Sequence, residues 1–177
     1  QGELEAAEAR LQAAERWLAA TDDGTPIFAD GAQFQLLPAT IASARTYLAL
    51  ALGDMAGTMK YGRRALALIP EADHHQRGTP AALLGLATWA SGDLAEAYRA
   101  FSEAMNSYQK AGNVMFAITG TYILADIRQA QGRLREAIQV YENALQLAQD
   151  HGEPPLRGTA ELHLGLSDLH REQGNLP

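Results

Sequence analysis

The stretch GRLREAIQVYENAL at residues 132–145 decides the fold, because its pattern recurs as GDLAEAYRAFSEAM at residues 92–105. The leading glycines of the two copies are 40 residues apart (132 − 92). Gly53 and Gly174 extend the series at intervals of 39 (92 − 53) and 42 (174 − 132). A period of this size is typical of helical solenoids. We therefore predict an all-α chain, an αα-superhelix of repeats that each hold a first helix, a turn and a second helix.

Composition limits the function. The 177 residues are 47% hydrophobic, which is enough to bury a core. Lysine and arginine number 14 against 21 acidic residues, a net charge of −7, which is the wrong sign for holding a phosphate backbone. We expect no direct nucleic-acid partner. The absence of cysteine excludes disulfides, thiol catalysis and cysteine-based zinc sites.

The sequence contains no apolar run of the roughly 18 residues that would span a bilayer, and no basic-then-apolar leader opens it. A cytoplasmic protein without a membrane partner is the expectation. The sequence starts at Gln1 inside a repeat and stops just after Gly174, where a second helix should begin. We interpret residues 1–177 as one array cut from a longer protein, whose uncapped ends favour self-association.

Helix signals divide the array. We expect irregular structure at residues 22–38 and a polar loop at residues 71–78, with Pro80 in the first turn of the helix that follows. The predicted units are an orphan second helix at 1–22, helical pairs at 39–70, 80–110 and 116–150, and the first helix of a truncated repeat at 158–177.

Small and large residues alternate at fixed offsets inside the pairs. Leu84 and Gly85 of one first helix are followed by Ala97, Phe101 and Ala104. This resembles the tetratricopeptide (TPR) pattern, in which small residues let two helices approach and a ring fills the space beside them. The standard TPR unit has 34 residues, so we expect the extra residues of each unit to lie in the loops.

The other units keep or break this pattern. The next pair has Leu124, Ala125, Ala137, Tyr141 and Ala144 at the same offsets, and the last first helix has Leu164 and Gly165. The first pair departs from it, with Arg45, Thr46, Thr58, Gly62 and Ala65. How that pair packs is left open.

Two stretches, residues 116–137 and 153–172, resemble more specifically the TPR sensor region of MalT-like, LuxR-type bacterial transcriptional regulators. The resemblance implies a region that binds a peptide, a protein or a small-molecule inducer and signals to a nucleotide-binding and a DNA-binding module. Neither a Walker-type phosphate loop nor a basic recognition helix is present in this sequence. The alternative is a TPR scaffold that holds proteins together without switching.

Few residues in the sequence suggest a metal-binding or catalytic site. His74 and His75 beside Asp73 suggest a metal site, but no third ligand has helical spacing to them, so a solvated loop is the favoured interpretation. His163 and His170 do not clamp one ion. No nucleophile, base and orienting group can be assembled. We therefore predict no enzyme activity, no metal and no cofactor.

The remaining candidate is the concave groove that first helices line in TPR arrays. Aromatic anchors with a few polar partners are what peptide and sugar grooves use. The predicted groove residues are Tyr47, Trp89, Tyr122, Asp126 and Gln129. For Trp89 an equally weighted alternative is packing between repeats as part of the core.

Overall fold

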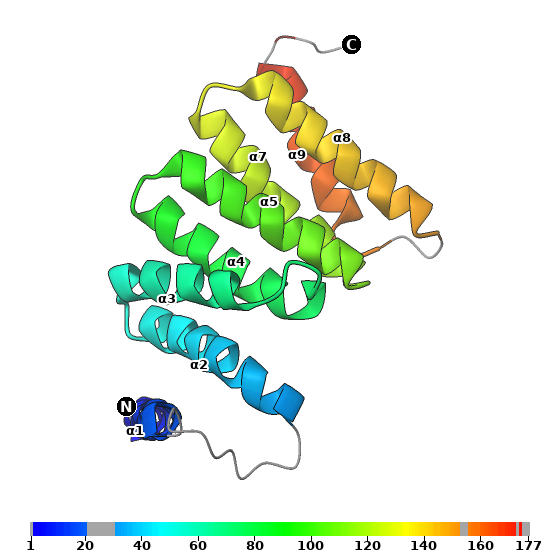
Figure 1. Ribbon diagram of the computed structural model, residues 1–177. Helices are drawn as coiled ribbons and strands as arrows, with labels where there is room; N and C mark the ends of the chain where they lie inside the picture. Colours follow the sequence, from blue (N-terminus) through cyan, green and yellow to red (C-terminus); the bar gives the residue numbers. More distant parts are fainter. Residues whose placement is uncertain (1, 21–30, 153–155, 173, 175–177) are drawn as a thin grey trace.

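The computed structural model describes residues 2–20, 31–152, 156–172 and 174 (Figure 1). This described part is helical and contains no strand, which confirms the all-α prediction. The helices are α1 (Gly2–Ala20), α2 (Gly31–Ala51), α3 (Met55–Leu68), α4 (His74–Ala90), α5 (Leu94–Lys110), α6 (Val114–Thr119), α7 (Thr121–Ala130), α8 (Leu134–Asp150) and α9 (Thr159–Glu172).

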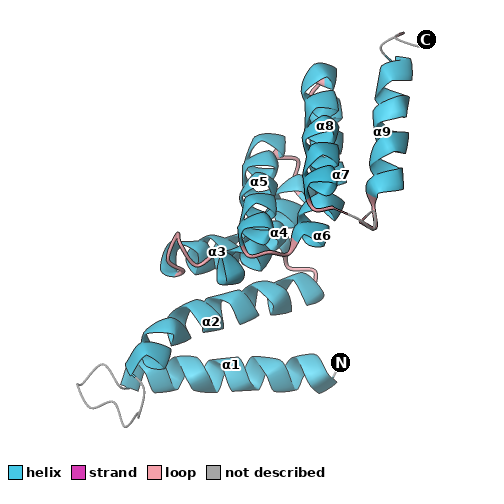
Figure 2. Cartoon of the chain, turned by 90° about the vertical axis from the view of Figure 1, so that its right-hand side faces the viewer, coloured by secondary structure: helices cyan, strands magenta, loops and turns pink. Residues whose placement is uncertain are grey.

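The helices stack in chain order, from α1 at one end of the array to α8 and α9 at the other (Figures 1 and 2). Helices α2, α4, α6–α7 and α9 are first helices, and α3, α5 and α8 are second helices. Each second helix packs against the first helix of its own pair and against that of the next pair. Helix α1 packs against α2. The result is the predicted superhelix.

The 40-residue period comes from long helices joined by short turns. Helices α5 and α8 begin at Leu94 and Leu134, 40 residues apart, and each has 17 residues. Three-residue turns follow α4, α5 and α7. Each turn holds a glycine in the left-handed region, with φ of 82° at Gly92, 80° at Gly112 and 71° at Gly132. The expectation that the extra residues lie in loops is wrong.

Two helices begin earlier than predicted. Helix α4 begins at His74, so most of the expected loop at 71–78 is helical, because the Asp73 carboxylate caps α4 by accepting a hydrogen bond from the Gln76 N–H at 3.1 Å. Pro80 lies in the interior of α4 and not in its first turn. Helix α2 begins at Gly31 and contains Pro38, where the sequence predicted irregular structure.

The predicted first helix of the 116–150 pair is interrupted. It forms α6 and α7, separated by Gly120. A Cβ on Gly120 would lie 1.9 Å from the Sδ atom of Met105, so this glycine leaves room for a side chain of α5. Thr121 also bonds back to the carbonyl of Ala117, at 3.1 Å. Glycine and threonine together account for the break.

The predicted pairing of small residues with rings is present in the core. A Cβ on Gly165 of α9 would lie 2.6 Å from the Cζ atom of Tyr141 in α8. Ala97 and Ala137 have no exposed surface, and Tyr141 is 4% exposed. These contacts let first and second helices approach closely, as the TPR pattern requires.

The first pair packs by a variation on this pattern. Thr46, Thr58 and Ala65 are all completely buried. The threonine hydroxyls donate to the carbonyls of Ala42 and Asp54, both at 2.8 Å, so neither is left unsatisfied. The pair whose packing the sequence left open is therefore a regular member of the array. In the described helices, none combines the length and apolarity needed to cross a membrane.

Candidate functional site

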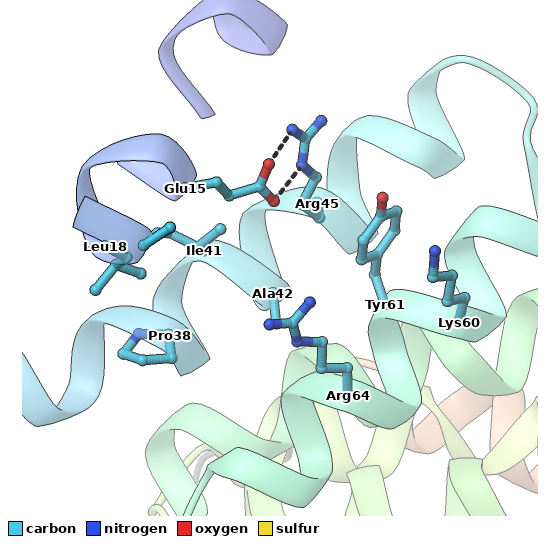
Figure 3. Close-up of a pocket in the computed structure, with 10 residues that line it drawn as sticks. Glu15, Leu18, Pro38, Ile41, Ala42, Arg45, Lys60, Tyr61 and Arg64 are labelled. Atoms are coloured by element: carbon cyan, nitrogen blue, oxygen red, sulfur yellow. Dashed lines mark hydrogen bonds and ion pairs between the residues drawn. The ribbon is translucent and has the colours of Figure 1, made fainter. Parts of the chain in front are cut away.

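A cavity of about 630 Å³ opens between α1, α2 and α3 (Figure 3). Its volume lies within the roughly 300–1,000 Å³ typical of small-molecule sites. The lining residues are Glu15, Leu18 and Ala19 of α1, Pro38, Ile41, Ala42 and Arg45 of α2, and Lys60, Tyr61 and Arg64 of α3.

Arg45 joins two walls of this cavity. Its guanidinium donates to the Glu15 carboxylate from Nε at 3.0 Å and from Nη2 at 2.7 Å, and it also pairs with Glu8. Arg45 is only 7% exposed, so the fork of the guanidinium is held in place between α1 and α2. Its hydrogen bonds hold the pKa values of Glu8 and Glu15 below their usual range.

The cavity has an apolar side and a cationic side (Figure 3). Leu18, Pro38 and Ile41 gather on one side, and Lys60, Tyr61 and Arg64 lie across from them. The Lys60 ammonium lies 5.3 Å from the centre of the Tyr61 ring. Across the described ranges, neither Lys60 nor Arg64 forms an ion pair with a carboxylate.

A second cavity of about 380 Å³ occupies the equivalent place further along the array. It opens between the second helices α5 and α8, with α6 and α7 between them. Its polar lining consists of hydroxyl and amide groups, including Asn106, Gln109 and Asn143, and it contains no charged residue. This second cavity therefore lacks the cationic side of the α1–α3 cavity.

The predicted groove residues lie on three different helices, α2, α4 and α7. Tyr47 is 52% exposed and lines an apolar groove of about 530 Å³ between α1 and α2. Trp89 is half-buried and meets the Phe101 ring edge to face, with centroids 6.4 Å apart. It packs against the core cluster of Phe101 and Ile127, which favours the core interpretation of Trp89.

The other three predicted residues lie on α7. The Tyr122 hydroxyl donates to the carbonyl of Gly158 at 2.8 Å, and its ring lies 6.1 Å from that of Tyr141. Asp126 is exposed, yet neighbouring groups partly desolvate it and raise its pKa. Gln129 is half-buried. These residues remain predictions as a binding surface, and Tyr122 already has a structural partner.

The histidine pair lies in the first turn of α4 and not in a loop. His74 is half-buried and His75 is exposed. Throughout the residues that the structure describes, no group of three or more histidine, cysteine, aspartate or glutamate side chains is placed to hold a metal ion.

Sequence reasoning missed the α1–α3 cavity. Its walls come from three helices, and no local motif brings Leu18, Ile41 and Arg64 together. One signal was present: Lys60 and Arg64 are four residues apart on a predicted helix, which places two cations on one face beside Tyr61.

The sequence model of the family described as the MalT-like TPR region matches residues 39–177. A comparison with curated proteins finds no significant match.

Solved structures share the fold. Over 98% of this chain, apo RapI superposes with a TM-score of 0.69 at 15% identity. BtubC (BKLC) from P. vanneervenii superposes with a TM-score of 0.66 at 15% identity, over 95% of this chain and 68% of its own. A putative kinesin light chain from Podosopora anserina, with nearly identical TPR-like repeats, gives 0.65 at 14% identity, over 95% of this chain and 79% of its own. The present chain spans 59% of the length of RapI.

Proposed function

Because this chain belongs to the family of MalT-like TPR regions, we propose that it is the sensor region of a cytoplasmic, LuxR-type bacterial transcriptional regulator. It binds a ligand and signals to nucleotide-binding and DNA-binding modules outside this sequence. Its role is binding and not catalysis. The observation that carries this proposal is the cavity whose walls are shared between α1 and the following helix pair.

The shared walls suggest how binding is transmitted. Helix α1 contributes Glu15, Leu18 and Ala19, whereas α2 and α3 contribute the rest. The main contacts of α1 are with α2. A ligand that touches both walls has different affinities for a docked and a displaced α1, and that difference is what shifts the population of the two states.

The proposal is tested by a thermal-shift screen with small organic acids, sugars, nucleotides and short peptides. A ligand present at 100 times its dissociation constant should stabilise the protein by about 2.7 kcal/mol. Hits should disappear in Ala19→Trp, which fills the cavity from an exposed lining position. The matched control is Ala13→Trp, an exposed position on the same helix, which should keep the hits.

A sensor also requires a response of α1. Hydrogen exchange of residues 2–20 should change when a hit binds, and it should not change in Ala19→Trp. A hit retained in Ala19→Trp but lost in Tyr47→Ala would instead place the ligand on the predicted first-helix surface. Binding with no change in α1 exchange would contradict the sensing mechanism.

One observation favours the alternative of a non-switching scaffold. The apolar groove between α1 and α2 is lined by Leu4, Leu11, Tyr47 and Leu48, and Tyr47 is about half exposed there. Such a groove suits an apolar peptide or helix face. A peptide that binds in this groove with unchanged hydrogen exchange elsewhere would support the scaffold.

A further inference from the structure

We propose that the α1–α3 cavity takes a small amphipathic anion, a molecule with an apolar body and a single carboxylate, sulfonate or phosphate group. This inference names the ligand class for the site of the proposed function, and it rests on that function.

The charge balance of the cavity points to an anion. Three cationic side chains, Arg45, Lys60 and Arg64, line it against the single carboxylate of Glu15. Glu15 is already bound by Arg45 through two hydrogen bonds. Lys60 and Arg64 therefore carry two positive charges that no carboxylate of the described chain neutralises by an ion pair, in a protein whose net charge is −7.

The donors are placed to act together. Lys60 and Arg64 are four residues apart on α3 and so share one face of the helix. Figure 3 shows the Arg64 guanidinium extending toward Ala42, while Lys60 stands beside the Tyr61 ring. A planar guanidinium with a nearby ammonium is the combination that recognises the oxygens of a carboxylate or phosphate group.

The opposite side of the cavity suits an apolar body. Leu18, Pro38 and Ile41 offer no side-chain hydrogen-bonding group there, and Ile41 is 7% exposed. A neutral sugar presents many hydroxyl groups, each of which needs a partner when it is buried. Because the one lining carboxylate is occupied by Arg45, the cavity favours an apolar anion over a neutral polyol.

The test compares two fluorescent probes that share a ring system. 8-Anilinonaphthalene-1-sulfonate carries a sulfonate, whereas N-phenyl-1-naphthylamine is neutral. We expect the anionic probe to bind saturably and Ala19→Trp to abolish this binding. Lys60→Gln/Arg64→Gln should weaken it by at least about tenfold, since hydrogen bonds to charged groups contribute that much, while the affinity for the neutral probe changes less than about twofold.

The matched control is Lys110→Gln/Arg135→Gln, which removes the same charge from exposed positions on α5 and α8. Circular dichroism verifies that each variant keeps its helix content. An equal loss of anionic-probe affinity in the control would show a net-charge effect and overturn the proposal. So would unchanged affinity in Lys60→Gln/Arg64→Gln.

The two proposals fail separately. If Ala19→Trp abolishes binding of both probes while Lys60→Gln/Arg64→Gln affects neither, the cavity binds the shared ring system whatever its charge; the anion class is then wrong and the sensor site stands. If Ala19→Trp leaves both probes bound with wild-type affinity, the cavity is not the binding site, and both proposals are wrong.

Discussion

Gly85 of α4 lies so close to Phe101 of α5 that a Cβ on Gly85 would be 2.8 Å from the Cδ2 atom of the ring. Phe101 is 3% exposed, so its ring is enclosed in the core. This contact sets how closely the two helices of the pair approach, and it gives the first prediction.

Gly85→Ala should lower the free energy of unfolding by about 1–3 kcal/mol through overpacking, although alanine is intrinsically better than glycine in a helix by about 1 kcal/mol. Gly120→Ala is the comparison, because it meets the flexible thioether of Met105 and should therefore cost less. Urea denaturation measures both. A Gly85→Ala protein as stable as the wild type would contradict the close approach.

Arg45→Met should release α1 from α2 while the rest of the array stays folded, because Arg45 carries the ion pairs to Glu8 and Glu15. Trp17 of α1 reports the release by fluorescence once Trp89→Phe removes the other tryptophan. Arg63→Met, which breaks the pair with Glu96 between α3 and α5, is the control and should leave the Trp17 signal unchanged.

The ion pairs of Arg45 with Glu8 and Glu15 also predict that acid releases α1. The pKa values of Glu8 and Glu15 are lowered from 4.5, first of all by hydrogen bonds from Arg45. Their contribution to α1 docking is therefore present above pH 4.5 and is lost as pH falls through the lowered folded-state values. In the Trp89→Phe protein, which keeps Trp17 as its tryptophan, fluorescence should show release of α1 below pH 4.5. In Arg45→Met the signal should be flat there; an identical transition in both proteins would exclude this cause.

Arg77→Ala should destabilise the protein by about 2–3 kcal/mol, since it removes one partner of a mostly buried charge network. Arg77 donates to the carbonyls of Leu66 at 2.9 Å and Ile69 at 2.7 Å, at the end of α3, and it pairs with Glu103 of α5. Arg77→Lys keeps the charge but loses the planar guanidinium that reaches several acceptors, so an intermediate loss of stability is expected. Arg99→Ala, at an exposed position on α5, should change the urea midpoint little.

Tyr141→Phe should reduce the loss of stability that occurs at alkaline pH. Burial, and then the negative charge of Asp126, raises the pKa of Tyr141 to about 12. The neutral phenol is thus favoured in the folded state, so its stabilising effect is complete below pH 10.0 and disappears as pH rises toward 12. Denaturation at pH 8 and pH 11 should give a smaller difference in Tyr141→Phe than in the wild type. Tyr47→Phe, at an exposed phenol, should behave as the wild type does.

The sequence was sufficient for the fold because the repeat fixes which residues meet. The offset from Gly85 to Phe101 predicted a close approach of two helices, and these two residues do contact each other. Helix starts were less predictable. Residues 74–77 are polar and precede Pro80, a pattern shared by loops and by exposed first turns, and only the Asp73 cap distinguishes the two.

The binding surface was the least predictable part. Trp89 and Tyr122 are aromatic residues on first helices, but each contacts a neighbour within the array. Trp89 packs against the ring of Phe101, and the Tyr122 hydroxyl donates to the carbonyl of Gly158. The α1–α3 cavity depends on how far α1 stands from α3, and that distance follows from the whole arrangement and not from a local pattern. Identifying it required the three-dimensional structure.

The three-residue turns also have a consequence for folding during translation. Because each helix packs mainly on helices that lie one or two places away in sequence, no segment has to wait for a distant partner to be synthesised. Contacts of this local kind favour fast folding. As the polypeptide leaves the ribosome, each new helix can dock on the one before it, so the array can grow from its N-terminal end during translation.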